Sequence, residues 1–155
     1  MFALTAHGAQ LYGTEPYIVH LDEVYGILVG LGLADGPLGT AAFLHDVVED
    51  TKVTRADIEE AFGEEVAKLV WAVTGIGRDR KGKSRSQFRK IQILGDDAAT
   101  LKLADRLCNV RRSKANRPDL FAMYQAEQPA FSAALEENGL GDPRLWKMLA
   151  EAFDA

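Results

Sequence analysis

Apolar residues recur at helical spacing along almost the whole chain, and this periodicity limits the fold more than any other feature of the sequence. One buried stripe is expected from five apolar residues that follow Pro16: Tyr17, Val24, Tyr25, Leu28 and Leu31. We find no alternating strand pattern of useful length, no internal repeat and no low-complexity linker. With 155 residues, the chain is long enough for one domain with a substantial core. We therefore predict a single all-α domain over residues 1–155.

Capping residues, glycines and prolines indicate where the helices begin and end. Thr54, with Asp57 three residues later, is typical of a capping box at the start of a short helix. Between Arg78 and Lys90, Gly82 and two serines predict a loop in the first half and a helix from about Ser86. The expected helices cover residues 17–31, 38–50, 54–62, 66–73, 86 onward, 98–112, 118–137 and 143–153.

The distribution of charge argues against a long nucleic acid as ligand. The formal net charge is −5, yet residues 78–90 hold seven Lys and Arg residues and only one acid, Asp79. Such a short basic segment in an acidic protein favours a small polyanionic ligand, although a solvated surface is the ordinary explanation of an isolated charge run. No apolar run approaches the roughly 20 residues that a membrane helix needs. The N-terminus has no signal-peptide pattern and Cys108 is the only cysteine, so we expect a cytoplasmic protein without membrane contact.

Polar residues gather in the segment Leu44 to Thr51. On a continuous helix, four of them would share one side: His45, Asp46, Glu49 and Asp50. Asp46 and Asp50 form an i,i+4 pair of like charges, which destabilises a helix unless something positive lies nearby. A divalent cation would remove this penalty and could use the imidazole as a nitrogen ligand. An acidic surface helix is the competing interpretation.

Two further segments place metal-binding residue types on other helices. Asp105 and Asn109 share one stripe of the helix expected at 98–112, and an acid within an apolar helix is costly to bury unless it is paired or ligated. His20 lies on the helix that follows Pro16. Together with His45 and Asp46, these residues supply two imidazoles and two carboxylates. This mixture suits manganese, iron or zinc with positions left open for water and phosphate.

The three segments resemble the hydrolase domain of Rel/SpoT enzymes and the stand-alone small alarmone hydrolases, a branch of the HD superfamily. The matching elements are Pro-Tyr-Ile-x-His at 16–20, His-Asp-x-x-Glu-Asp-Thr at 45–51 and Leu-Ala-Asp-Arg-x-x-Asn at 103–109. Order and approximate spacing match as well, and the likeness extends from about His7 to Tyr124. The combination is specific, whereas a His-Asp pair alone would be weak.

The resemblance implies a helical HD-type bundle and a metal-dependent 3′-pyrophosphohydrolase of nucleotide alarmones, such as guanosine 3′,5′-bis(pyrophosphate). It implies that one Mn²⁺ is held by four ligands: His20, His45, Asp46 and Asp105. Glu49 and Asp50 become the acidic pair that orients and deprotonates the attacking water. The substrate contacts that it implies, to sugar, phosphates or base, are Asn109, Lys81, Lys83, Arg89, Lys90 and Tyr124.

One departure from the family concerns the base. Family members commonly have an Arg-Lys pair after the glutamine that corresponds to Gln10, and the Arg packs on the purine. Here Tyr12 stands in this shorter segment and the pair is missing. Tyr12 can stack on a base but carries no charge, so both a guanosine and an adenosine alarmone fit the sequence. Leu21 also replaces the proline that usually follows the first ligand histidine.

Two other functions stay open at this point. One is a broader HD nucleotidase or phosphodiesterase that acts on nucleoside monophosphates or cyclic nucleotides and would not release pyrophosphate. The other is a non-catalytic binding module on an HD scaffold, which would not need the complete ligand set. The last segment, from Tyr124 to Ala155, is expected to provide packing residues for the core or for the interface of a homodimer. They are Phe131, Leu135, Leu145, Trp146 and Leu149.

Overall fold

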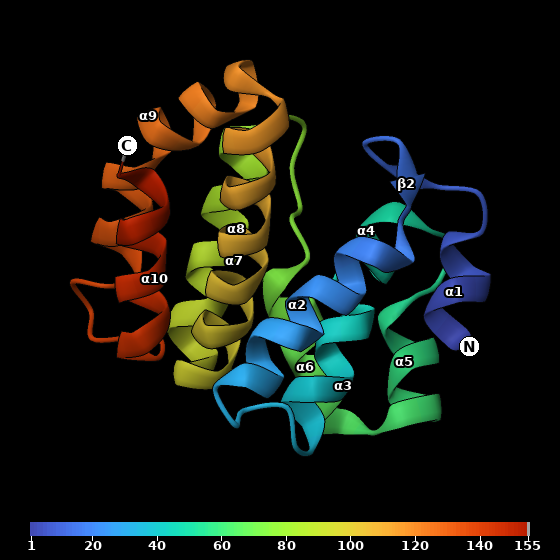
Figure 1. Cartoon of the computed structure of the whole chain (residues 1–155). Coiled ribbons are helices and arrows are strands. Elements are labelled where there is room, and N and C mark those ends of the chain that lie inside the picture. The colour runs from blue at the N-terminus through green and yellow to red at the C-terminus, as the bar shows by residue number, and fades with distance from the viewer. Residues whose placement is uncertain (155) are drawn as a thin grey trace.

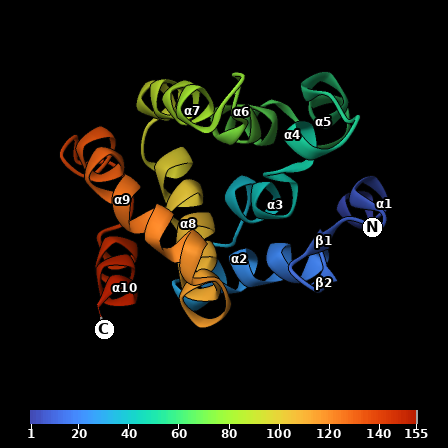
Figure 2. The ribbon, with the colours of Figure 1, turned by 90° about the horizontal axis from the view of Figure 1, so that it is seen from above.

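Helix α8, Asp96–Asn116, lies in the middle of the molecule (Figure 2). The structure is a computed structural model that describes residues 1–154. Six helices pack against α8: α2 (Ile18–Gly30), α3 (Pro37–Leu44), α6 (Glu64–Val73), α7 (Arg80–Leu94), α9 (Pro118–Ala134) and α10 (Pro143–Phe153). Leu101, Leu103 and Leu107 of α8 are completely buried. A helix that is apolar on more than one side can be stable only where neighbours cover those sides, which explains the central position of α8.

The remaining elements lie beside the N-terminal helices. They are α1 (Phe2–His7), the strands β1 (Leu11–Tyr12) and β2 (Glu15–Pro16), α4 (Val47–Asp50) and α5 (Arg55–Phe62). Figure 1 shows α1 and the hairpin at one end of the molecule and α9 and α10 at the other. The all-α class predicted from the sequence is confirmed, because every helix or strand among residues 1–154 is a helix except the two short strands of the hairpin.

The N-terminal residues contain one helix and two strands that the sequence pattern did not predict. Helix α1 has six residues, and β1 and β2 form an antiparallel pair in which Tyr12 lies opposite Glu15. Each strand is only two residues long, which is too short for the alternation of apolar and polar residues to be recognised. Gly13, with a φ of +63°, allows the tight turn between the strands.

The helix predicted over residues 38–50 is two helices. Helix α3 ends at Leu44, His45 and Asp46 form a turn, and the single turn of α4 begins at Val47. The backbone of Asp46, with φ −106° and ψ 0°, departs from helical values. The prediction was wrong here because nothing in the spacing of apolar residues marks a break of two residues, and the side chains of this turn meet at the candidate site.

The boundary predicted within the basic segment was also wrong. Helix α7 begins at Arg80 instead of near Ser86, and Asp79 caps it by accepting a hydrogen bond from the backbone N–H of Gly82 at 2.8 Å. Aspartate is a preferred N-cap residue, so this signal was present in the sequence. Gly82 is tolerated within the first turn. Helix α9 ends at Ala134, three residues before the end of the predicted helix at residue 137.

The core is apolar and also contains polar side chains that need partners. The packing residues of the C-terminal segment are buried within this chain, which confirms their interpretation as core residues: Phe131, Leu135, Leu145, Trp146 and Leu149. His20, His45 and Asp105 are buried as well. Buried groups of this kind must be hydrogen-bonded or ligated. None of the helices within residues 1–154 combines the length and apolar character that crossing a membrane requires.

Candidate metal centre and active site

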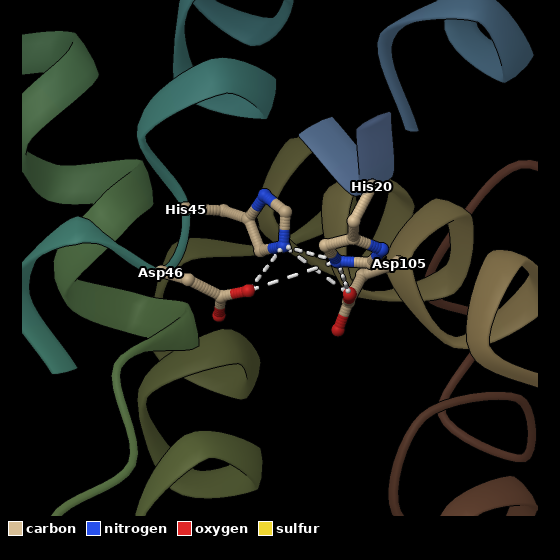
Figure 3. Close-up of side chains that lie close together, drawn as sticks. All are labelled: His20, His45, Asp46 and Asp105. Carbon is tan, nitrogen blue, oxygen red and sulfur yellow. Dashed lines mark hydrogen bonds and ion pairs between the residues drawn. The ribbon is translucent and has the colours of Figure 1, made fainter. Parts of the chain in front are cut away.

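Four side chains from three parts of the chain point toward one another (Figure 3). His20 comes from α2, His45 and Asp46 from the turn between α3 and α4, and Asp105 from the middle of α8. One ligand atom from each residue lies within 4.8 Å of the others. The sequence therefore identified four residues that the fold brings together, although residues 20 and 105 are far apart in the chain.

The distances within this group are short. Nε2 of His45 lies 2.9 Å from Oδ2 of Asp46 and 3.2 Å from Oδ1 of Asp105. Nε2 of His20 lies 3.0 Å from the same Asp105 oxygen. The two Nε2 atoms are 3.2 Å apart. Two ring nitrogens and two carboxylate oxygens thus face one small volume.

Three of these residues, His45, Asp46 and Asp105, are held by further hydrogen bonds from outside the group. Nδ1 of His45 lies 2.7 Å from the carbonyl oxygen of Ala42, which can only accept, so Nδ1 carries the proton. When His45 is neutral, this tautomer directs the lone pair of Nε2 into the group, as a metal ligand must. Tyr17 donates its hydroxyl to Asp46, and Asn109 donates its amide to Asp105 Oδ1 at 3.1 Å.

The electrostatics of the group favour a positive charge at its centre. Burial alone lowers the pKa of His45, but Asp46 and Asp105 outweigh it and hold the pKa well above its usual value. Burial raises the pKa of each carboxyl, yet His45 brings the pKa of Asp46 below its usual value and that of Asp105 far below. Two ionised carboxylates and two imidazoles with buried nitrogens are the donor set of a divalent cation such as Mn²⁺, Fe²⁺ or Zn²⁺. The residues present therefore fit such a cation.

A cavity of about 820 Å³ opens beside the group. Asp46, Asp105 and Asn109 line it, and the first turns of α7 add basic side chains to its lining. Helix α9 contributes Tyr124 and Glu127. A volume of this size is in the usual range for a small-molecule site.

Glu49 and Asp50 are placed differently. Glu49 is half-buried on the cavity wall, with Oε1 3.4 Å from Nζ of Lys83. Burial and the charges of Asp46 and Asp50 raise its pKa, while Lys83 and Lys102 offset part of the rise. Asp50 is exposed and does not line the cavity, and its Oδ2 accepts a hydrogen bond from Gln10 at 3.0 Å.

Gly75 allows Glu49 and Lys83 to approach each other. A Cβ atom at this position would lie 2.7 Å from Cβ of Lys83 and 3.0 Å from Oε1 of Glu49. These separations are below ordinary van der Waals contact, so a side chain at residue 75 would force the two groups apart. The absence of a side chain at Gly75 therefore sets the spacing between Glu49 and Lys83 on the cavity wall.

The predicted basic contacts divide into two groups. Lys81 and Lys83 line the cavity. Arg89 is exposed and Lys90 is buried, and neither belongs to the cavity wall. Nζ of Lys90 donates to the carbonyl oxygen of Thr74 at 2.5 Å and lies over the ring of Trp71, which are contacts of a structural residue. The structure thus does not bring Arg89 and Lys90 to the site.

The three other predicted substrate contacts are Asn109, Tyr124 and Tyr12, and not all of them line the cavity. Asn109 and Tyr124 line the cavity. Tyr12 does not: its hydroxyl donates to Oδ1 of Asn109 at 2.7 Å, and its ring lies 4.4 Å from that of His20. The guanidinium of Arg112 lies over the same Tyr12 ring at 4.7 Å. These neighbours leave Tyr12 without an open face toward the cavity.

Several cavity residues were not predicted from the sequence. Arg80 makes two hydrogen bonds with Glu127, at 2.5 and 3.0 Å, and both Arg80 and Arg106 lie against the ring of Tyr124. These contacts join α7, α8 and α9, and no local spacing indicates them. Lys102 also lines the cavity. Its position three residues before Asp105 was the available signal, because i,i+3 side chains are neighbours on a helix.

Comparison with a family model and with a solved structure shows what the chain resembles. A model described as HD domain matches residues 1–131. A solved structure, described as a metazoan orthologue of SpoT that hydrolyses ppGpp and plays a role in starvation responses, superposes with a TM-score of 0.80 and 31% identity. The similarity covers 98% of this chain and 89% of the other.

Curated bacterial proteins resemble the chain over most of its length. Guanosine-3′,5′-bis(diphosphate) 3′-pyrophosphohydrolase of Aquifex aeolicus is 44% identical over 115 residues, or 71% of this chain. Bifunctional (p)ppGpp synthase/hydrolase SpoT of Escherichia coli is 40% identical over 127 residues, or 77% of the chain. The chain spans only 16% and 18%, respectively, of the lengths of these two relatives.

Proposed function

The chain belongs to the HD domain family, and from this premise we propose that it is a metal-dependent hydrolase that removes pyrophosphate from the 3′ position of an alarmone nucleotide. The observation that carries the proposal is the group His20, His45, Asp46 and Asp105 at the end of a cavity with basic walls. The solved relative that hydrolyses ppGpp, similar over nearly the whole chain, supports the same activity. We further propose that residues 1–155 act as one HD-type domain in the cytoplasm.

One Mn²⁺ ion per chain is the proposed cofactor, with His20, His45, Asp46 and Asp105 as its ligands. When bound, such an ion lowers the pKa of a coordinated water and polarises a phosphoryl oxygen. The chain's own contribution is to orient the ligands: Ala42 fixes the tautomer of His45, and Tyr17 and Asn109 each hold one ligand carboxylate. Such outer contacts typically affect metal affinity and activity by about 10- to 100-fold.

Glu49 is the proposed general base. Its carboxylate lies on the cavity wall, and its pKa is raised by burial and by Asp46, which makes it a better proton acceptor than an exposed glutamate. We propose Asp50 as its partner, because Gln10 holds the Asp50 carboxylate and its negative charge contributes to the raised pKa of Glu49.

The charge of the cavity supports a polyanionic substrate. Seven Lys and Arg residues and five Asp and Glu residues line it, and two of the acids, Asp46 and Asp105, belong to the proposed ligand group. Lys81 and Lys83 are proposed to contact the phosphates, where fixed positive charges stabilise the charge of a phosphoryl-transfer transition state. Water attack at the phosphorus bonded to O3′ then yields pyrophosphate and a nucleoside 5′-di- or triphosphate.

The nucleoside is proposed to lie between Asn109 and the aromatic wall of the cavity. Asn109 retains hydrogen-bonding capacity near the metal group, and Tyr124 supplies aromatic surface beside Phe88 and Phe131. Tyr12 is enclosed by His20, Asn109 and Arg112, so its proposed role changes from stacking on the base to holding Asn109. No charged side chain corresponding to the missing Arg-Lys pair selects guanine, and we propose that both guanosine and adenosine alarmones are substrates.

A chromatographic product assay tests this function. The Mn²⁺-loaded protein is incubated separately with guanosine and with adenosine 3′-pyrophosphates, and the products are separated by anion-exchange HPLC. We expect pyrophosphate and the nucleoside 5′-phosphate product. Release of orthophosphate would indicate the broader nucleotidase instead, and a protein that binds the metal without turnover of either substrate would indicate a non-catalytic HD module.

A further inference from the structure

Lys102 is the basic side chain that contacts the candidate metal group most directly. It lies on α8, one turn before Asp105, and its Nζ is 3.5 Å from Oδ2 of that carboxylate. Its side chain is 19% exposed and lines the cavity together with Glu49. By contrast, the Lys83 side chain, which comes from α7, is 45% exposed. Lys102 is therefore an enclosed ammonium group that faces the place where the proposed reaction occurs.

The carboxylate beside Lys102 is already shared by several groups. Oδ1 of Asp105 contacts the Nε2 atoms of His20 and His45 and accepts from Asn109. A divalent cation bound by this group would take up the negative charges of Asp46 and Asp105, and little of the Asp105 charge would then be left for Lys102. Glu49, the other nearby acid, forms its ion pair with Lys83. Among residues 1–154, no second carboxylate oxygen lies within the 4.0 Å ion-pair limit of Lys102 Nζ.

A partly buried ammonium group without a full counter-charge is unfavourable, so the loaded site favours an anion at this point. A ligand in the cavity can reach Lys102 beside the metal group, because Lys102 and Asp105 both line the cavity. A phosphoryl group that approaches the metal group from the cavity would therefore place its negative oxygens next to Nζ. The three N–H groups of the Lys102 ammonium can donate to such oxygens, and they do not require one fixed orientation of the phosphoryl group.

We propose that Lys102 is a catalytic residue that contacts the 3′-phosphoryl group of the substrate and stabilises its charge during attack. This inference rests on the proposed function and adds a substrate-contacting group to it. Lys102 acts from the side of α8, whereas Lys81 and Lys83 act from α7. The phosphoryl group is thereby held between cations of two helices. This position orients its phosphorus toward the water that Glu49 activates.

The test compares Lys102→Met with Lys102→Arg. The probe is guanosine 3′,5′-bisphosphate, which keeps the 3′ phosphate but has no phosphoanhydride bond. Its binding to the Mn²⁺-loaded protein is measured by calorimetry, and Mn²⁺ binding is measured in a separate titration. For Lys102→Met, we expect bisphosphate affinity to fall by about 10- to 150-fold, the scale of one charge-assisted contact. Mn²⁺ affinity should stay the same or rise, and Lys102→Arg should recover most of the bisphosphate affinity.

The control is Lys68→Met, because Lys68 is an exposed lysine of α6 whose partner, Glu64, is also exposed. It should leave both affinities unchanged. Weakened Mn²⁺ binding by Lys102→Met with unchanged bisphosphate affinity would overturn the proposal, since Lys102 would then only position Asp105. Wild-type affinity for both ligands would overturn it as well. If the unmodified protein hydrolyses its substrate and Lys102→Met hydrolyses it equally fast, only this inference fails; if the unmodified protein releases no pyrophosphate, the proposed function itself fails.

Discussion

Nε2 of His45 lies 2.9 Å from Oδ2 of Asp46, although the two residues are neighbours in the chain. Adjacent side chains on a continuous α-helix diverge by about 100° and do not meet. Here they meet because α3 ends at Leu44 and the two residues form a turn before α4. The break in the helix is what allows one short segment to supply two ligands to the same point, with Glu49 following on the cavity wall.

The ligand assignment predicts that Asp105→Ala loses tightly bound Mn²⁺. The substitution removes the oxygen that contacts both imidazoles, so the remaining three residues cannot enclose a cation as well. Metal content after dialysis should fall from about one equivalent to near zero, while helical circular dichroism stays largely unchanged. Asp97→Ala, an exposed acid in the first turn of the same helix, is the control. A variant at 105 that keeps one equivalent of metal would show that the assignment is wrong.

Glu49→Gln should separate chemistry from binding. The amide has nearly the shape of the carboxylate but cannot accept the proton from water, so we expect kcat to fall by about 10²-fold or more. Mn²⁺ content and KM should change little, because Glu49 is outside the ligand group. Asp50→Asn, at an exposed position held by Gln10, should have the smaller effect. Near-normal turnover by Glu49→Gln would remove its role as base.

The raised pKa of Glu49 predicts the acid side of the pH profile. A general base works when it is deprotonated, so kcat/KM should fall as the pH drops through the pKa of Glu49. Burial and the charges of Asp46 and Asp50 raise the pKa, and Lys83 and Lys102 lower it. Removing a cation by Lys83→Met should therefore move the acid limb to higher pH. A limb that stays in place or moves to lower pH would contradict the assignment.

Within the basic segment, replacing a lysine that lines the cavity should lower kcat/KM, whereas replacing an arginine on the outer surface should not. Lys83→Ala should lower kcat/KM by about 10- to 150-fold at unchanged metal content, the scale of a charge-assisted contact in a partly dehydrated site. Arg89→Ala, from the same helix but outside the cavity wall, should behave like the unmodified protein. Equal effects of the two substitutions would indicate that only general surface charge matters.

Gly75→Ala should impair the site by a steric route. The added methyl group would lie 2.7 Å from Cβ of Lys83 and must push α7 away from Glu49. We expect lower kcat/KM and a lower melting temperature. Gly26→Ala in α2 is the matched control, because its added Cβ meets no atom within 4 Å. This exposed helical position should gain about 0.5–1 kcal/mol of stability from reduced backbone entropy. Loss of stability at both positions would contradict the steric explanation.

Some parts of the fold and of the site could be predicted from the sequence, and others could not. Helices with a clear apolar stripe, such as the one through Leu103 and Leu107, were predictable because burial imposes the helical period on the sequence. The four candidate ligands were recognisable because the metal chemistry limits them to few residue types within specific motifs. The turn at His45 and Asp46 was not, since neither residue disfavours a helix strongly.

The α9 wall of the cavity was the least predictable part. Glu127 meets Arg80 across 47 positions of the chain, and such a pair depends on how α7 and α9 pack. Arg80 belongs to the basic segment 78–90, but nothing in the local sequence indicates that it pairs with Glu127. Likewise, Lys83 and Arg89 lie on different sides of α7, so only Lys83 faces the cavity. The sequence analysis did not predict this difference, because it placed the start of the helix after Lys83. Only the packed structure distinguishes the charges that enter the cavity from those that face the solvent.

A metal-dependent 3′-pyrophosphohydrolase activity is tested most sharply by hydrolysis of guanosine 3′,5′-bis(pyrophosphate) in ¹⁸O-labelled water. The Mn²⁺-loaded protein is used, and the products are analysed by mass spectrometry. Water attack at the phosphorus bonded to O3′ predicts pyrophosphate that carries one ¹⁸O atom and an unlabelled guanosine 5′-diphosphate. Asp105→Ala should give neither product. Labelled orthophosphate, label in the nucleotide, or equal turnover by Asp105→Ala would contradict a metal-dependent 3′-pyrophosphohydrolase.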